Sequence, residues 1–246
     1  MIEKIIREIK NTLKTKAPHL TEVQRSRMYK ILNSDNPDFI GLGNKHSDIE
    51  KLVRNIQKEY NLTYQIVLDI FKILIRSNVY DEKIAGIFLL NRFKKDFSRN
   101  TIKMIGEVIP KYFDTWAITD TTIIRVIGPF LAKSINNQLA EQTIEEWSNS
   151  QNHWNRRAAL VIFLKIVMVN KNFRSDAVFS LVERMREDPE EYVHKGIGWL
   201  LKTCSNYDPD IIFEYLMKNK QRLSRIILRY ASEKLPKDKR AQILKK

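Results

Sequence analysis

Cysteine, glycine and proline are scarce in this chain of 246 residues. Cys204 is the single cysteine, so the chain cannot form an intramolecular disulfide, and nothing indicates an oxidising compartment. The seven glycines and seven prolines are spread between apolar segments, and no Ser/Gly-rich or Pro-rich stretch interrupts the chain. We therefore expect one continuous domain over residues 1–246.

Long apolar runs are also missing. The longest, Ala158 to Leu164, is much shorter than the roughly 20 residues that a membrane-spanning helix needs. The first ten residues carry a charge every three or four positions, which is typical of an amphipathic helix and unlike a signal peptide. These features predict a soluble, cytoplasmic protein that has no membrane partner.

The patterns of several kinds of chemistry are absent as well. The histidines are too far apart for a zinc pattern; they are His19, His46, His153 and His194. Gly41 and Gly43 lack the spacing of a phosphate-binding loop and are interpreted as a turn between helices. Cys204 lies in an apolar segment without a basic activator, which favours a packed core thiol. We expect no metal ion and no small-molecule cofactor.

Positive charge is abundant. The chain has 43 Lys and Arg residues against 29 Asp and Glu residues, a formal net charge of +14. Such an excess favours a polyanionic partner, because each cation placed against a phosphate releases condensed counterions. Nucleic acid is the partner that this charge favours, and a merely basic, solvated surface is the alternative.

Apolar residues recur at three- and four-residue spacing almost throughout the chain, which predicts an all-α protein. The predicted helices are 2–14, 21–33, 46–59, 63–77, 81–94, 100–112, 119–134, 138–148, 153–169, 175–186, 190–204, 208–218 and 221–233. Their lengths and short connections are typical of stacked helical pairs.

Several helices begin with a basic residue and continue with an apolar body. These starts are Lys83, Arg156, Lys195 and Arg225. Arg156 and Lys195 are 39 residues apart, and Lys83 precedes Arg156 by 73 residues, which matches one and two HEAT-type hairpin repeats. We therefore predict HEAT-like helical hairpins stacked in a curved solenoid, with these cations along a basic concave face. Unrelated amphipathic helices with scattered cations are the alternative.

Trp116 and Asp120 stand one helical turn apart, and residues 121–140 contain no other acidic side chain. An aromatic face beside a lone carboxylate can hold a cation. Separately, each residue has an ordinary explanation, since a tryptophan is usually buried in a core and an aspartate at a helix start is usually a cap. The pair together suggests a functional site.

Four segments resemble motifs of the AlkD family of DNA glycosylases, which are HEAT-like helical proteins that remove alkylated bases. The segments are Phe39-Ile-Gly-Leu42 with Tyr29 before it, Trp116-Ala-Ile-Thr-Asp120, Trp154-Asn-Arg-Arg-Ala-Ala159, and His194-Lys-Gly-Ile-Gly-Trp-Leu-Leu201. The resemblance extends over most of the chain. Two positions differ from the family pattern: Ala117 replaces an aspartate and Thr119 replaces an apolar residue.

The resemblance implies a role for each matching residue. Asp120 would be the catalytic carboxylate, with Trp116 and Trp199 as aromatic walls beside the lesion. Arg157 would hold the DNA backbone, and Tyr29 would approach the lesion region. The remaining predicted DNA-binding residues are Arg156, Lys195 and Lys202.

The expected function is that of a monofunctional alkylpurine-DNA glycosylase, a hydrolase that removes 3-alkyladenine and 7-alkylguanine from double-stranded DNA. We expect a monomer associated with the nucleoid. Two alternatives remain open. The first is a noncatalytic HEAT-like module that binds bent, branched or damaged DNA, and the second is a scaffold for an acidic protein.

Overall fold

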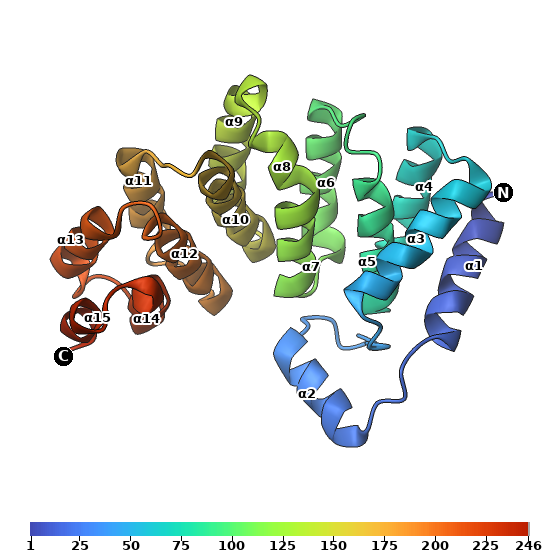
Figure 1. Cartoon of the computed structure of the whole chain (residues 1–246), viewed down its shortest axis with the longest axis horizontal. Helices are drawn as coiled ribbons and strands as arrows, with labels where there is room; N and C mark the ends of the chain where they lie inside the picture. Colours follow the sequence, from blue (N-terminus) through green and yellow to red (C-terminus); the bar gives the residue numbers. More distant parts are fainter. Residues whose placement is uncertain (246) are drawn as a thin grey trace. The chain divides into compact units, whose positions relative to one another are not determined.

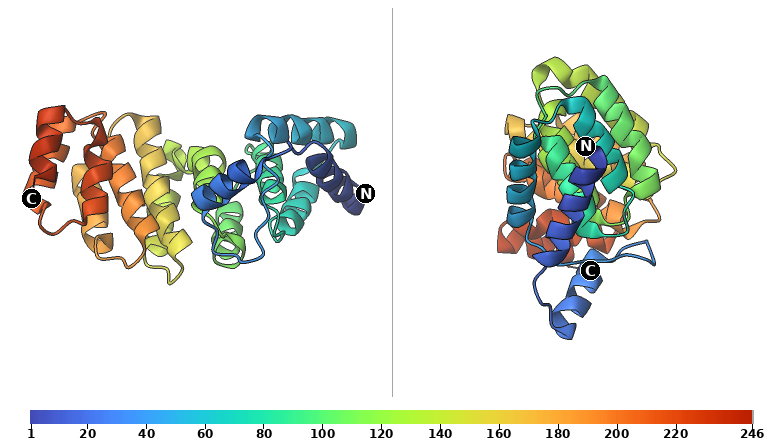
Figure 2. Two further views of the ribbon diagram at one scale, coloured as in Figure 1. Left: turned by 90° about the horizontal axis from the view of Figure 1, so that it is seen from below. Right: turned by 90° about the vertical axis from the view of Figure 1, so that its right-hand side faces the viewer.

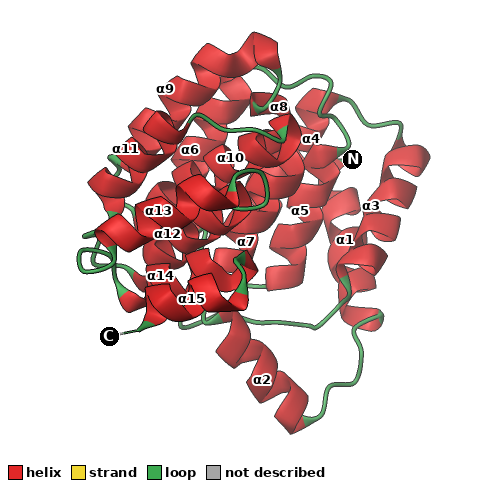
Figure 3. Ribbon diagram, turned by 60° about the vertical axis from the view of Figure 1, so that its left-hand side comes forward, coloured by secondary structure: helices red, strands yellow, loops and turns green. Residues whose placement is uncertain are grey.

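The computed structural model of the chain describes residues 1–245 and is built from helices joined by short loops (Figures 1 and 3). The only β pairing among these residues is an isolated bridge between Ile40 and Val79. The predicted all-α class is therefore confirmed. The described helices are all too short or too polar to cross a lipid bilayer.

The chain divides into two compact units, Met1–Ile127 and Gly128–Lys246, and each is described by itself. The prediction of one domain over residues 1–246 stays a prediction. The elements of the N-terminal unit are α1 (Ile2–Thr15), α2 (Glu22–Leu32), α3 (His46–Tyr60), α4 (Tyr64–Leu74), α5 (Tyr80–Asn91), α6 (Arg99–Tyr112), α7 (Trp116–Thr121) and a π-helix (Thr122–Ile127).

The elements of the C-terminal unit are α8 (Gly128–Leu131), a 3₁₀ turn (Ser134–Asn136), α9 (Asn137–Ser148), α10 (His153–Asn170), α11 (Ser175–Met185), α12 (Glu191–Cys204), α13 (Pro209–Asn219), α14 (Arg225–Ala231), a second 3₁₀ turn (Ser232–Lys234) and α15 (Lys237–Leu244). Helices α10, α12 and α14 pack against one another in sequence order, while α9 packs on α10, and α11 and α13 pack on α12. The pairs α9–α10 and α11–α12 follow one another as the HEAT-like pattern predicts, and α14 continues the row of α10 and α12.

A ladder of ion pairs joins equivalent positions of successive repeats, on α9, on α11 and directly after α13. Glu145 on α9 pairs with Arg184 on α11 at 2.6 Å, and Glu183 on α11 pairs with Arg222 after α13 at 3.0 Å. Each pair joins residues 39 apart in sequence, the repeat length predicted from Arg156 and Lys195. The repeat therefore sets both the helix packing and the charge pairing in this unit.

Helix α5 is the centre of the N-terminal unit and is buried on all sides. It packs against α1, α3, α4 and the π-helix. Its apolar side chains, from Ile84 to Leu90, are almost completely inaccessible to solvent. The helix also begins with three consecutive charged residues, Asp81, Glu82 and Lys83, and these are buried as well. Such charges need partners from other elements, because an unpaired buried charge is strongly destabilising.

The predicted helix boundaries are close to the observed ones, with three corrections. The expected helix 119–134 begins earlier, at Trp116, because Thr115 is the N-cap and its hydroxyl accepts the Ile118 N–H at 3.1 Å. The expected helix 221–233 begins later, because Ser224 is the N-cap of α14. Helix α15 was not predicted, since Ile243 is its only buried residue and its sequence lacks an apolar stripe.

His46, at the start of α3, packs against two aromatic rings in the N-terminal unit. Its Nε2 atom lies 3.1 Å from the Tyr80 Oη atom, and its ring meets Phe88 edge to face at 5.3 Å. Burial lowers the pKa of His46 from 6.5, and the Arg125 guanidinium lowers it further. The neutral imidazole is thus the form that the fold favours.

This shift makes the free energy of unfolding depend on pH. Below about pH 6.5 the unfolded chain binds a proton at His46 more readily than the folded chain, so stability decreases as the pH falls. Urea unfolding at about pH 7.5 and about pH 5.5 should show a larger loss for the wild type than for His46→Gln. Equal losses in the two proteins would show that His46 does not cause this dependence.

Candidate functional site

Helix α7 carries both residues of the predicted catalytic pair. Trp116 is the first residue of α7 and Asp120 the fifth, so the two lie about one turn apart. The Trp116 indole N–H donates to the Ile31 carbonyl oxygen at 2.9 Å, which ties α7 to the end of α2. Asp120 is not a cap, because Thr115 occupies that position, and it exposes only 7% of its surface. The local geometry therefore keeps an indole and a mostly buried carboxylate on one short helix.

A π-helix, Thr122–Ile127, begins two residues after Asp120. Two hydroxyls bond to carbonyls one turn back in this region: Thr119 Oγ1 donates to Thr115 O at 3.2 Å, and Thr122 Oγ1 donates to Ile118 O at 2.8 Å. Such bonds satisfy buried threonines and often accompany bent helices. They also explain how Thr119 is accommodated where the family usually has an apolar residue. Short π-helical turns are rare and are found frequently at functional sites.

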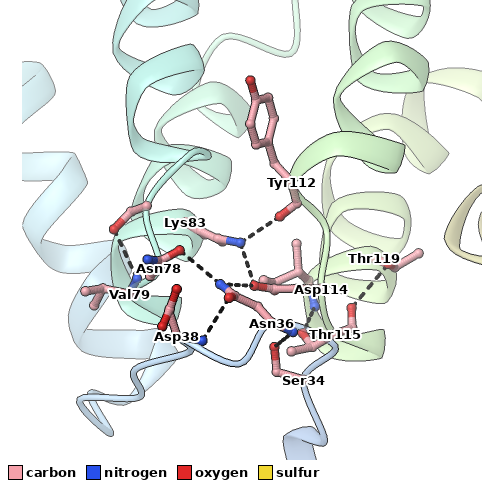
Figure 4. A network of polar contacts seen from close by, with 12 residues as sticks. Ser34, Asn36, Asp38, Asn78, Val79, Lys83, Tyr112, Asp114, Thr115 and Thr119 are labelled. Atoms are coloured by element: carbon pink, nitrogen blue, oxygen red, sulfur yellow. Dashed lines mark hydrogen bonds and ion pairs between the residues drawn. The ribbon is translucent and has the colours of Figure 1, made fainter.

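The segment before α7 is held by a buried polar network (Figure 4). Lys83 Nζ lies 2.7 Å from Asp114 Oδ2 and donates a second bond to the Tyr112 carbonyl at 2.7 Å. Asn36 Nδ2 also donates to Asp114 Oδ2, at 3.4 Å, and the Asp35 N–H donates to the Asp114 carbonyl at 2.8 Å. Helix α5 and the segment after α2 thus fix the turn from which α7 begins.

The other two charges of α5 hold further parts of the N-terminal unit. Asp81 accepts the N–H groups of Leu42 and Asn44, both at 2.8 Å, and Glu82 pairs with Lys10 of α1 at 2.8 Å. Gly43, between the two donors, has φ +87°, a value that favours glycine. The segment lies between α2 and α3, as the sequence interpretation predicted, and forms an irregular loop.

Tyr29, on α2, contacts the same turn. Its Oη atom accepts the Gly41 N–H at 3.4 Å, and its ring meets Phe39 edge to face at 5.5 Å. Tyr29 is half-buried, so part of its ring remains accessible. The structure therefore places Tyr29, Trp116 and Asp120 in one unit, with α2 linked to α7 through the Ile31–Trp116 hydrogen bond.

The C-terminal unit holds the other predicted residues on α10 and α12. Lys195, Trp199 and Lys202 are spaced by four and three residues, so they lie on one face of α12. Tyr192 belongs to the same face, three residues before Lys195, and the sequence interpretation missed it. Its spacing from Lys195 and Trp199 is the signal that could have identified it. This face alternates aromatic and cationic side chains.

Each lysine on this face lies between a tyrosine ring and a glutamate. Lys195 lies 4.8 Å from the Tyr192 ring centroid and pairs with Glu191. Lys202 lies 5.7 Å from the Tyr230 ring centroid and pairs with Glu233 at 2.8 Å. Both glutamates are exposed, and exposed ion pairs contribute little to stability. A phosphate could therefore replace either carboxylate at small cost.

Arg157 is buried, with 5% of its surface exposed. Its Nη1 atom donates to the Tyr192 carbonyl at 2.5 Å, and its guanidinium lies 6.0 Å from the Tyr192 ring centroid. The side chain thus joins α10 to the first turn of α12. This contact orients the guanidinium beside the mixed aromatic and cationic face.

Arg156 is held much more firmly than the sequence suggests. Four of its five N–H donors bond within the unit, two to the Asp188 carboxylate and one each to the carbonyls of Ser150 and Gln151. Its predicted contact with DNA stays a prediction, in competition with these bonds. For Lys83, the prediction of a place on an exposed basic strip is wrong, because only 3% of the residue is exposed and Asp114 binds its ammonium group.

Two glycines of the motif His194–Leu201 allow neighbouring helices to approach α12. A Cβ atom on Gly198 would lie 2.4 Å from the Tyr230 Cβ of α14, which is not possible without movement. A Cβ atom on Gly196 would lie 3.1 Å from the Leu160 Cδ1 of α10. These glycines therefore position Tyr230 and Arg157 close to α12.

Cys204 is buried at the end of α12, and burial raises the pKa of its thiol to about 12. It is a core thiol, as predicted. Among residues 1–245 no group of three or more His, Cys, Asp or Glu side chains could hold a metal ion.

The predicted site residues thus form two groups, one in each unit. Tyr29, Trp116 and Asp120 belong to the N-terminal unit, and the remaining residues belong to the C-terminal unit; these are Arg156, Arg157, Lys195, Trp199 and Lys202. Their convergence into one site stays a prediction.

Comparisons with known proteins agree on fold and family. The structure is similar to that of a protein described as a predicted DNA alkylation repair enzyme from Enterococcus faecalis, with a TM-score of 0.73 and 20% identity over 90% of this chain and 100% of that one. Two structures from Streptococcus mutans, smu.31 and AlkD2, each give a TM-score of 0.54 and 20% identity. They cover 96% and 95% of this chain, respectively, and 99% of their own.

At these identities the structural likeness shows the fold. No curated protein matches the chain. The family model for DNA alkylation repair enzymes matches residues 9–235, which is most of the sequence. The chain belongs to the DNA alkylation repair enzyme family.

Proposed function

We propose that this protein is a monofunctional DNA glycosylase that hydrolyses the N-glycosidic bond of cationic alkylated purines in double-stranded DNA. The observation that carries the proposal is the arrangement of α7, where Trp116 and Asp120 lie one turn apart directly before a π-helix. The buried Lys83–Asp114 pair and the Trp116–Ile31 hydrogen bond give this short helix a defined position. Such preorganisation is what an electrostatic catalyst requires.

The chemistry of the substrate fits a site without a general acid. Alkylation at N3 or N7 gives the purine a positive charge, so the base leaves with the electrons of the C1′–N9 bond and becomes neutral. Positive charge then develops on the sugar, as it does in glycoside hydrolysis. Water adds to C1′ and releases a proton, which gives an abasic site and the free base.

Asp120 would stabilise the cationic sugar and orient the attacking water. Because Asp120 is mostly buried, its carboxylate acts in a medium of lower dielectric constant, where attraction to a cation is stronger than in water. Trp116 and Trp199 would each add a cation–π attraction of roughly 0.5 to 2 kcal/mol. The aromatic and cationic face of α12 would bind the DNA strand near the lesion.

The experiment is the release of free base from methylated duplex DNA. The purified protein should liberate 7-methylguanine and 3-methyladenine faster than spontaneous depurination, as measured by chromatography of the soluble products. Undamaged duplex of the same sequence is the control and should release no base above background. A protein that binds the methylated duplex but releases neither base contradicts the proposal.

Binding to damaged DNA without catalysis is the second candidate function. The burial of Asp120 favours it, because a carboxylate with 7% of its surface exposed offers a substrate little direct access. This function predicts equal affinity of the wild type and Asp120→Asn for damaged duplexes, with no base release by either protein.

A further inference from the structure

Arg125, in the middle of the π-helix Thr122–Ile127, is held by two other elements of the N-terminal unit. Its guanidinium lies 4.7 Å from the centroid of the Phe88 ring of α5, and its Nη2 atom forms an ion pair with the Glu50 carboxylate of α3. Helix α5 packs against both α3 and the π-helix, and the three elements follow one another along the N-terminal unit (Figures 1 and 2). Arg125 therefore joins the π-helix to two neighbouring helices.

The two contacts of Arg125 depend on its shape as well as its charge. Phe88 is 2% exposed, so its ring is a fixed part of the core. The side chains of Arg125 and Glu50 are 39% and 34% exposed, and solvent weakens an ion pair at such exposure. A flat guanidinium can stack on a ring while it pairs with a carboxylate, whereas an ammonium group cannot stack in this way. The arrangement thus requires arginine and not merely a positive charge.

The π-helix needs support from its surroundings. Such helices are rare, and they occur mostly as single turns inside α-helices. At the start of the segment, the hydroxyls of Thr119 and Thr122 bond to carbonyls one turn back. Arg125 adds contacts to α3 and α5 within the π-helix itself. Local and tertiary contacts therefore both contribute to this backbone form.

The π-helix also sets the direction in which Asp120 points. A π turn contains about one residue more than an α turn, and each residue of an α-helix turns the chain by about 100°. A change of the segment from the π to the α form would rotate Asp120 relative to Arg125 by an angle of this order. Because Asp120 is only 7% exposed, even a smaller rotation would move its carboxylate among different neighbours.

We propose that Arg125 is a positioning residue for base removal. Its contacts with Glu50 and Phe88 maintain the π-helix and thereby the direction of the Asp120 carboxylate. Arg125 acts through the backbone, so it influences the chemical step and not the affinity for the duplex. The catalytic part of this inference rests on the proposed function, while the structural part is testable without any base release.

The first test compares Arg125→Met with Arg184→Met. The control removes an arginine of similar exposure, 41% for its side chain, from an ion pair with Glu145 in the C-terminal unit. Single-turnover release of 7-methylguanine from methylated duplex should fall by on the order of tenfold to 10²-fold in Arg125→Met, because a displacement of about 1 Å at a catalytic group has effects of this size. Duplex affinity should change by the same small factor in both variants, since each loses one positive charge. Equal rates in the two variants would overturn the proposal.

Two further variants separate positioning from charge. Arg125→Lys keeps the charge but cannot stack flat on Phe88, so its rate should also fall while its duplex affinity stays that of the wild type. An affinity that is lost in Arg125→Met and restored in Arg125→Lys would indicate a phosphate contact and would overturn the proposal. Glu50→Gln should lower the rate as well, and adding it to Arg125→Met should cause little further loss, because the two residues act as one unit. Fully additive losses would contradict this coupling.

Hydrogen exchange tests the structural part. The amides of Thr122–Ile127 and the indole N–H of Trp116 should exchange faster in Arg125→Met than in the wild type, while the amides of α1 and α4 stay unchanged. Arg184→Met should match the wild type at all these positions. Unchanged exchange in the π-helix overturns the proposal, and so does faster exchange throughout the unit, which shows a general loss of stability. If exchange changes as expected but the wild type releases no base, the glycosylase proposal fails while the role of Arg125 in the π-helix stands.

Discussion

Asp120→Asn should lower the rate of 7-methylguanine release from methylated duplex by on the order of 10² to 10³-fold, while duplex affinity stays close to that of the wild type. The amide keeps the shape of the side chain but removes the negative charge that stabilises the cationic sugar. Single-turnover release at saturating protein concentration measures this effect separately from binding. Because Asp120 is mostly buried, thermal unfolding of the variant must also be measured.

Asp38→Asn is the matched control, since it makes the same chemical change at an exposed aspartate of the same unit. Its rate should equal that of the wild type. A rate for Asp120→Asn within a few-fold of the wild type would remove Asp120 from the mechanism. A large rate loss accompanied by an equal loss of duplex affinity would show that Asp120 acts in binding and not in the chemical step.

The second large effect concerns stability. Lys83→Met should lower the free energy of unfolding by about 3 to 5 kcal/mol, because it leaves Asp114 charged and buried without its cation. The Lys83 side chain is 4% exposed and that of Asp114 is 9% exposed, so solvent screens the pair very little. The Asp114 Oδ1 atom already has no hydrogen-bond partner, which leaves the carboxylate dependent on its contacts through Oδ2. Urea unfolding measures the change.

Two further variants test this explanation. The double variant Lys83→Met/Asp114→Leu should recover much of the lost stability, since replacing both charges removes the uncompensated one. Arg174→Met breaks an exposed pair with Asp176 and should leave stability nearly unchanged. If Lys83→Met is as stable as the wild type, the buried pair does not anchor the turn before α7.

Much of the fold could be predicted from local patterns. The three- and four-residue spacing of apolar side chains located the helices, and the 39-residue interval between Arg156 and Lys195 matches the ion-pair ladder of the C-terminal unit. The π-helix after α7 could not be predicted in this way. Its sequence, Thr-Ile-Ile-Arg-Val-Ile, gives no sign of a π-helix, and the hydroxyl–carbonyl bonds of Thr119 and Thr122 form only in the folded chain.

The candidate site was predictable where its residues share one helix. Trp116 and Asp120 lie one turn apart because four residues make about one helical turn, and Lys195, Trp199 and Lys202 share a face of α12 for the same reason. Tyr192 was missed, although it follows this spacing. The burial of Asp120 also escaped prediction, since it depends on how other elements pack around α7.

The sequence by itself determined the helices, the repeat and the family motifs, because these depend on neighbours within about one or two turns of the chain. Only the tertiary structure decided which cations are paired with carboxylates and which remain exposed. Lys83 and Arg156 look alike as helix starts, yet both are neutralised by aspartates 31 and 32 residues away, whereas Arg27 and Lys30 remain exposed on α2. Whether a cation is free to bind a phosphate depends on which distant carboxylate the fold brings within bonding distance, and no local pattern records that.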